Sequence, residues 1–228
     1  MLSGDLYDYF KSDVVDLEDP PLWTEAETFL YMNDAYRMFV RLTGGIPDST
    51  SLLTQVPIQS GTAFADVDPR ILRFRLAYKV SNGEELVIVN QEELHNLTRS
   101  DYGVVRPLVI DNSAGAVQYM VVGQERNMVR WVQIPVVDDT AQISVYRLPL
   151  DTIDEGDMGF AFPEIGEEHH EHLSLWMKHR AYSKQDAETF DRGRAADNKK
   201  QFEDYCAASK AEWERYKHKT RVVSYGGL

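Results

Sequence analysis

The sequence predicts an α+β protein, a helical bundle with an antiparallel β-sheet or sandwich inserted between its first helix and its last two. Three observations carry this prediction. Apolar residues recur every three to four positions in residues 20–45, alternate in residues 55–150, and return to the helical spacing after residue 166. The first helix has a wide apolar face that needs partners, and the other strong helical patterns lie more than a hundred residues later.

The chain has 228 residues, a formal net charge of −13 and a hydrophobic content of 43%. Such a chain can bury a core, and its acidity disfavours non-specific binding to DNA or to an anionic membrane. A single cysteine, Cys206, excludes an internal disulfide framework and a cysteine-rich zinc site. The N-terminus lacks the apolar stretch of a signal peptide, and no apolar run approaches the ~20 residues that span a bilayer, so we expect a soluble protein.

The pattern divides the chain into an arm, a bundle in two pieces, a β-rich insert and a tail. The expected bounds are 1–19 for the N-terminal arm, 20–50 and 160–217 for the helical bundle, 51–159 for the insert and 218–228 for the C-terminal tail. The arm is acidic and contains several aromatic residues. It is either a short helix packed on the domain or a segment that a neighbouring molecule orders, and the residues do not choose between these alternatives.

The first helix has clear start and stop signals. Thr24 is a candidate N-cap, Glu27 completes a capping box, and two prolines precede them. Gly44 and Gly45 provide a C-terminal stop. The expected apolar face consists of Phe29, Met32, Tyr36, Phe39, Val40 and Thr43.

The insert is expected to contain a hairpin and several short strands. Ser81-Asn82-Gly83 forms the turn between strands at 71–78 and 85–89. Asn90 is an N-cap candidate for a short helix at 91–97. Further strands are expected at 107–111, 116–122, 128–134 and 141–148. Short antiparallel strands at this spacing favour a small sandwich or a curled sheet.

Two helices are expected after an acidic linker at 151–165, one at 166–184 and a long one at 186–217. The long helix carries an apolar stripe at spacings of 4, 3, 4 and 3, namely Phe202, Cys206, Ser209, Trp213 and Tyr216. The chain's one basic cluster follows this stripe and consists of Lys217, His218, Lys219 and Arg221. It either compensates the helix dipole or contacts an acidic partner.

The strongest candidate for a metal-binding site is a histidine-rich segment, residues 167–172. His169 and His172 are three residues apart, and Glu168 and His172 are four apart, so they could share a helix face and a metal ion. The order is not that of an HExxH motif. The plainer interpretation is a solvated first turn whose glutamates favour the helix dipole. We therefore assign no metal ligand and no cofactor.

Other candidate chemistry is weaker. The linker acids lack the spacing of an EF-hand: Asp151, Asp154, Glu155 and Asp157. Cys206, on an apolar helix face, is best explained as a buried and inert thiol. The sequence contains no nucleophile elbow, P-loop or dinucleotide-binding glycine pattern. We assign no catalytic residue and expect an assembly protein rather than an enzyme.

Two segments of the chain resemble the adaptor proteins that join head and tail in tailed phages. The first is Leu22-Trp23-Thr24-Glu25-Ala26-Glu27, followed by Tyr31-Met32-Asn33-Asp34-Ala35. The second is Phe162-Pro163-Glu164-Ile165, then His169, Leu173 and Trp176, the run from Arg180 to Asp191, and finally Ala195 and Phe202. The second segment is similar to the helix pair that closes those adaptors. The long charged end after Phe202 departs from the family pattern.

The resemblance implies a structural virion protein, an adaptor that forms a ring beneath the portal and joins the capsid to the tail. Its expected partners are the portal protein, a nozzle or tail-tube protein, and copies of itself, usually twelve in that family. The ring would enclose DNA without sequence-specific binding, because negative walls repel phosphates. The expected location is the virion neck, after assembly in the host cytoplasm. The arm or the tail would become ordered on binding.

The residues expected at the portal interface are Trp213, Tyr216, Lys217, Lys219, Arg221, Val222, Val223 and Tyr225. Two other functions compete with this one. A metal-dependent hydrolase would use His169, His172 and one acid of the linker. A carbohydrate-binding tail module would need exposed aromatic rings on the insert, for which the candidates are Tyr119, Trp131 and Tyr146.

Overall fold

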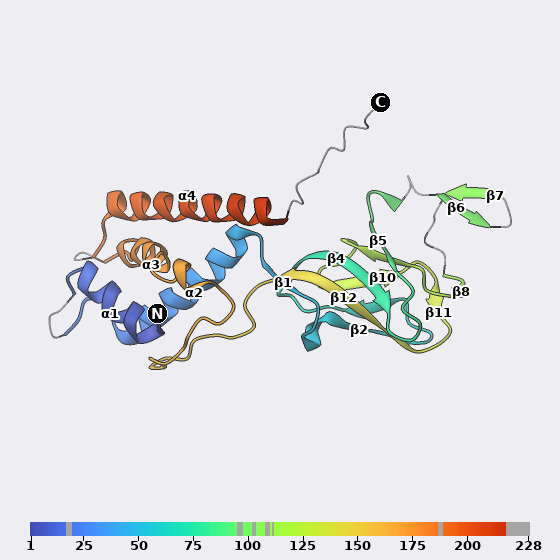
Figure 1. Ribbon diagram of the computed structural model, residues 1–228, viewed down its shortest axis with the longest axis horizontal. Helices are drawn as coiled ribbons and strands as arrows, with labels where there is room; N and C mark the ends of the chain where they lie inside the picture. Colours follow the sequence, from blue (N-terminus) through green and yellow to red (C-terminus); the bar gives the residue numbers. More distant parts are fainter. Residues whose placement is uncertain are drawn as a thin grey trace, which may run out of the picture. The chain divides into compact units, whose positions relative to one another are not determined.

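In the computed structural model, helices from the two ends of the chain pack together, and the strands come between them in sequence (Figure 1). The structure describes residues 1–16, 20–94, 98–101, 104–107, 110, 112–186 and 189–217. The chain divides into two units: a helical unit, which combines Met1–Gly45 with Pro149–Leu228, and a β unit, the continuous segment Ile46–Leu148. The predicted α+β class is confirmed.

Helix α2, Glu25–Thr43, begins and ends at its predicted signals. The Thr24 hydroxyl oxygen accepts a hydrogen bond from the Glu27 amide (3.2 Å), and the Glu27 carboxylate accepts one from the Thr24 amide (3.0 Å). Gly44 ends the helix at φ 102°, a conformation that favours glycine. The predicted apolar face is buried apart from Thr43, which is half-buried: Phe29, Met32, Tyr36, Phe39 and Val40.

Helix α1, Ser3–Asp13, shows that the beginning of the arm is a helix packed on the domain, the first of the two alternatives. Leu6 and Phe10 are completely buried. Lys11, in the last turn of α1, forms a buried ion pair with Asp16, which follows the helix. The Lys11 ammonium also donates to the Trp23 carbonyl. Residues 17–19 of the expected arm lie outside the described residues.

The two late helices begin later than predicted. Helix α3 spans Leu173–Tyr182, because residues 167–172 form a 3-10 helix (η3, Glu167–His169) and a turn instead. No side chain caps the N-terminus of η3 or of α3. Helix α4 spans Arg192–Lys217. Its start is set by Asp191, whose carboxylate accepts a hydrogen bond from the Arg194 amide (3.0 Å).

Contacts between distant segments close the helical unit. The Trp23 indole N–H donates to the Ala181 carbonyl (3.3 Å), which joins the start of α2 to α3. The Trp176 indole N–H of α3 donates to the Asp34 carboxylate of α2 (2.8 Å), and its ring lies 5.3 Å from that of Phe202 of α4. The first and last parts of the chain therefore share one core.

Two sheets of the β unit also share one core. The first has the order β1-β12-β2, with β4 paired to β12, and its strands are β1 Ile46–Asp48, β2 Gln55–Ile58, β4 Ile71–Lys79 and β12 Asp139–Arg147. The second has the order β3-β10-β9-β5, with β3 Phe64–Asp66, β5 Val87–Asn90, β9 Tyr119–Val122 and β10 Met128–Trp131. Ile143 of the first sheet joins Met120 and Trp131 of the second in one fully buried cluster.

Short elements complete the β unit. Strands β6 Thr98–Asp101 and β7 Val104–Pro107 form an antiparallel pair, and β8 Ala114–Gly115 pairs in parallel with β11 Ile134–Pro135. A 3-10 helix, η1, spans Leu52–Thr54.

The hairpin expected at Ser81-Asn82-Gly83 forms its turn but not its full pairing. Gly83 adopts φ 70°, and the pairing is limited to the Tyr78–Glu85 bridge with backbone hydrogen bonds from the Lys79 amide to the Glu84 carbonyl and from the Leu86 amide to the Ala77 carbonyl (both 2.8 Å). Strand β5 then pairs in parallel with β9, so the insert is mixed rather than wholly antiparallel. The physical reason for this pairing is burial. Leu86 and Val89 are each 1% exposed, and the course of the chain here places them in two different apolar clusters.

Other boundaries in the insert also move. Residues 91–93 form a turn and Leu94 is in 3-10 conformation where a helix at 91–97 was expected, and residues 95–97 lie outside the described residues. Strand β7 ends at Pro107, and most of the strand expected at 107–111 lies outside the described residues as well. The strand expected at 128–134 is divided into β10 and β11.

Candidate functional site

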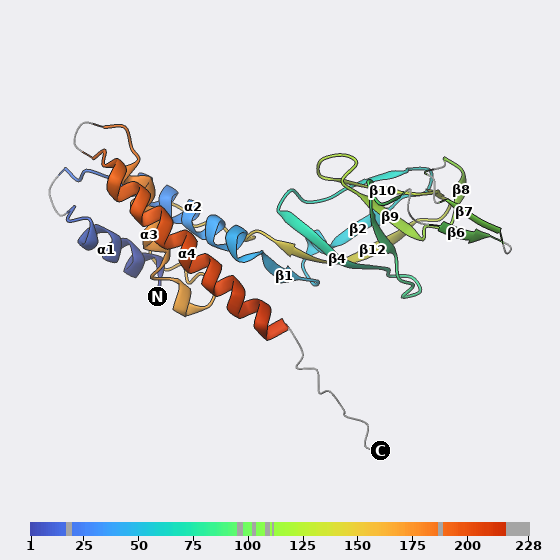
Figure 2. The same ribbon diagram turned by 90° about the horizontal axis from the view of Figure 1, so that it is seen from above.

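The C-terminal part of α4 carries a stacked aromatic pair on its surface. Trp213 and Tyr216 have ring centroids 5.5 Å apart and planes inclined by 11°. Trp213 is 37% exposed and Tyr216 is 82% exposed. Figure 2 shows the whole length of α4 and the end of the helix that follows this pair.

The aromatic pair continues the stripe that holds α4 in the helical unit. Phe202 and Cys206 are 0% and 1% exposed, whereas every residue from 210 to 216 is exposed. Residues spaced by three and four lie on the same side of a helix, so the buried and the exposed parts of the stripe face the same way. The helix therefore extends an apolar surface past the part that its own unit covers.

Of the eight residues predicted at the portal interface, Trp213 and Tyr216 have described side chains, and these two rings stack on each other. Lys217 is the last residue of α4. The other five lie outside the described residues: Lys219, Arg221, Val222, Val223 and Tyr225. The role of all eight residues in binding stays a prediction.

The histidine cluster packs against aromatic rings. His172 stacks on Tyr205 of α4 with ring centroids 3.6 Å apart and planes inclined by 4°. His169 Nδ1 lies 2.8 Å from the Tyr205 hydroxyl, and the His169 ring packs on Phe39 of α2. Burial lowers the pKa of His169, which favours the neutral imidazole. These rings connect η3 to both α2 and α4.

The arrangement of the histidines corrects the idea of a shared helix face. Residues 167–172 form a 3-10 helix and a turn, so the spacing of an α-helix does not apply to His169 and His172. His170 is 1% exposed, and its ring nitrogens lie 3.1 and 3.3 Å from the carbonyls of Met1 and Ile165. Among the described residues, no group of three or more His, Cys, Asp or Glu side chains is placed to hold a metal ion. The geometry therefore does not favour a metal-dependent hydrolase.

The aromatic residues proposed for sugar binding are largely buried. Trp131 is 0% and Tyr146 is 3% exposed, and Tyr119 is partly buried against an apolar cluster. The guanidinium of Arg73 lies 4.6 Å from the centre of the Tyr146 ring. A carbohydrate platform needs exposed ring faces, so the geometry does not favour this alternative either.

Cys206 is buried on the inner side of α4. Burial raises the pKa of its thiol to about 12, so the thiol stays protonated near neutral pH. Its environment agrees with the inert role that the sequence indicates.

The outer side of α2 holds residues that the sequence analysis did not use. Leu30 is 59% exposed, and Arg37 and Arg41 lie exposed on the same side of the helix. Neither arginine forms an ion pair within the described part of the chain. Leu30, Arg37 and Arg41 are spaced by seven and four residues, which places them on one side of the helix, opposite the buried apolar face. This side could therefore have been identified from the sequence.

A comparison with protein families identifies the family of this chain. None of the helices in the described ranges is long and apolar enough to span a membrane. A comparison with curated protein sequences finds no match. The family described as SU10 adaptor protein matches residues 4–222, nearly the whole length. This confirms the resemblance to phage adaptors and the structural role that it implies, so the chain belongs to the SU10 adaptor protein family.

Proposed function

We propose that this chain is a head-to-tail adaptor that forms a ring beneath the portal and joins the capsid to the tail. The family match supports an adaptor role in the virion. The observation that carries the finer proposal is the Trp213–Tyr216 stack at the exposed end of α4. Large aromatic rings that remain exposed in a folded unit are the residues that most often anchor protein interfaces.

The portal protein is the proposed partner of this end of the chain. Trp213 and Tyr216 supply apolar contact area, and the basic residues of the sequence beyond them supply charge: Lys217, Lys219 and Arg221. Val222, Val223 and Tyr225 are proposed to extend the contact. Exposed ion pairs contribute little by themselves, so the rings should dominate the affinity.

The other proposed partners follow from the adaptor role. Copies of the chain form the ring, twelve by resemblance to other adaptors, and a nozzle or tail-tube protein binds on the side away from the portal. The ring encloses DNA without reading its sequence, and the net charge of −13 keeps phosphates from adhering to it. Assembly takes place in the host cytoplasm, and the mature position is the virion neck.

The proposal is tested by mixing the purified protein with portal rings from the same phage and measuring the mass of the complex. We expect the protein to add to each portal ring in a fixed ratio. The double variant Trp213→Ala/Tyr216→Ala should bind at least about tenfold more weakly, because interface aromatic residues commonly contribute more than about 1.4 kcal/mol. Phe190→Ala removes an aromatic ring that is 53% exposed elsewhere in the helical unit and serves as the matched control.

Two results would count against the proposal in different ways. A wild-type protein that ignores portal rings would remove the portal-adaptor function. A double variant, or a chain truncated after Tyr216, that binds like wild type would leave the function intact and remove the assigned contact residues.

A further inference from the structure

The α2 outer face, defined as Leu30, Arg37 and Arg41, is a cationic surface on an acidic protein. The three residues recur on the side of α2 opposite Phe39, whose ring faces Tyr205 of α4. Both guanidinium groups are exposed, and neither forms an ion pair within the described ranges. The acidic residues of α2 nearest this side, Glu27 and Asp34, are already paired with Lys184 at 2.8 Å and with Arg180 at 3.1 Å. Two arginines and a leucine are therefore available to a partner.

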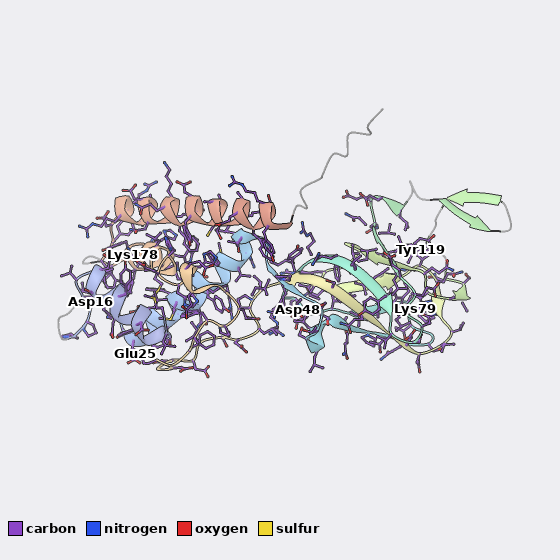
Figure 3. The ribbon with its side chains drawn as sticks, in the orientation of Figure 1. Asp16, Glu25, Asp48, Lys79, Tyr119 and Lys178 are labelled. Carbon is purple, nitrogen blue, oxygen red and sulfur yellow. The ribbon has the colours of Figure 1, made fainter. Side chains whose placement is uncertain are left out.

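An acidic face lies on the same unit, where α1, the start of α2 and the loop at residues 154–158 come together. The Gly4 amide of α1 donates to the Met158 carbonyl at 3.0 Å. A Cβ atom on Gly156 would lie 3.6 Å from the Glu25 carboxylate, so the start of α2 adjoins the same loop. Figure 3 labels Glu25, the first residue of α2. The exposed carboxylates of the acidic face are Asp8, Glu25, Asp154, Glu155 and Asp157.

A cation lies near the acidic face, the Lys11 ammonium 5.8 Å from the centre of the Tyr7 ring, but it is already paired with Asp16. None of its five carboxylates forms an ion pair with a residue that the structure describes. Burial and the charges of Glu25, Asp16 and Asp8 raise the pKa of Tyr7, which places Glu25 and Asp8 near one side chain. Leu2 and Met158, 44% and 40% exposed, add apolar area beside these charges.

We infer that the α2 outer face of one copy docks on the acidic face of the next copy, which rests on the proposed ring. The two surfaces are complementary in charge, two guanidinium groups against five carboxylates, and each includes exposed apolar side chains. They are different surfaces of one unit, so the contact is heterologous and adds copies head to tail. A ring needs a contact of this kind, whereas a self-complementary patch would stop at a dimer.

The inference is tested with charge reversals that change surface residues only. One variant carries Arg37→Glu/Arg41→Glu, and the other carries Glu25→Lys/Asp154→Lys/Glu155→Lys, which turns the five negative charges of the acidic face into a net charge of +1. Copies bound per portal ring are counted by mass for each variant and for an equal mixture of both. Arg126→Glu, an exposed change in the β unit, is the matched control.

Each variant alone presents like charges at the contact. The protein concentration needed to fill the portal ring should therefore rise at least about tenfold. The mixture should restore filling, because each reversed face then meets a face of opposite sign on the other variant. A single variant that fills the ring like wild type, or a mixture that does no better than its components, would overturn the inference. Circular dichroism of each variant checks that the helices are intact.

The same experiment separates this inference from the proposed function. A wild-type protein that fails to bind the portal removes the function and, with it, the ring on which the contact depends. A wild-type protein that fills the ring while the charge pattern has no effect keeps the function and removes only the pairing of these two faces.

Discussion

The helical unit and the β unit are stabilised in different ways, and the difference follows from how the chain reaches each of them. The β unit is one continuous segment, with an apolar cluster shared by its two sheets. The helical unit combines the two ends of the chain, and polar contacts connect them, such as the buried bond from Trp23 to Ala181 and the partly buried one from Trp176 to Asp34. Such contacts have strict geometry, so they select one way of joining the ends.

The two units also differ in charge. By sequence, the helical unit carries 15 basic and 25 acidic residues, and the β unit carries 9 and 12. Most of the net charge therefore lies on the unit that we propose contacts both the portal and neighbouring copies. Charged surfaces steer association and exclude wrong partners more than they stabilise a fold.

Asp16→Ala should have the largest effect on stability, and it should be confined to the helical unit. Asp16 accepts hydrogen bonds from the Lys11 ammonium and from the Leu22 (2.7 Å) and Trp23 (3.2 Å) amides. Removing the carboxylate leaves the Lys11 ammonium buried without its counter-charge, which costs about 3–5 kcal/mol. Urea unfolding measures the loss, and hydrogen exchange should show lost protection in α1 to α4 while β12 stays protected.

Asp8→Ala is the control for that prediction, because Asp8 is exposed on the same helix and should change stability by less than about 0.5 kcal/mol. If Asp16→Ala also removed protection from β12, the two units would unfold together, and the comparison between them would fail.

Ile143→Ala is the matching test of the β unit. Ile143 of β12 is completely buried and pairs with Ala77 of β4. The lost methyl groups and the cavity that remains should cost about 2–5 kcal/mol. Hydrogen exchange should report lost protection in β4, β10 and β12 with little change in α2. A uniform loss over both units would again contradict separate stabilisation, and the exposed substitution Leu52→Ala controls for surface effects.

The smallest effect is expected from pH, again in the helical unit. Burial lowers the pKa of His169 and of His179 from the usual 6.5. The unfolded chain therefore binds these protons more readily than the folded chain does. The free energy of unfolding is therefore highest above pH 6.5, where both histidines are neutral in the folded and the unfolded chain, and it decreases as the pH falls below 6.5.

Urea midpoints at several pH values between about 5.5 and 7.5 measure this dependence. His169→Gln should flatten the fall in stability at the acidic end, because glutamine does not titrate. A variant with the same pH profile as wild type would show that His169 is not responsible, and His179→Gln would then be compared in the same way.

Local signals predicted much of the helical unit. The Thr24–Glu27 capping box and the Gly44 stop act within a few residues, so the bounds of α2 could be derived from the sequence. The start of α3 could not, since the segment before it forms a 3-10 helix and a turn in which the His170 ring bonds to the backbone of Met1. A contact over such a distance leaves no local pattern.

The exposure of the candidate interface residues could not be predicted from the sequence. The 4-3 spacing placed Trp213 and Tyr216 on the side of α4 that includes Phe202, but spacing cannot distinguish a buried position from an exposed one. The structure shows where the rest of the helical unit stops covering this side. It also shows His172 stacked on Tyr205, a partner that its neighbours in sequence do not reveal.

The sequence by itself determined the α+β class, the capped helix α2, the acidic net charge and the resemblance to phage adaptors. Each of these depends on residues close together in the chain or on composition alone. Only the tertiary structure decided the parallel partner of β5, the packing of the histidines and the exposure of the aromatic pair. These depend on which apolar surfaces are buried together, and burial is decided by segments that are distant in sequence and adjacent in space.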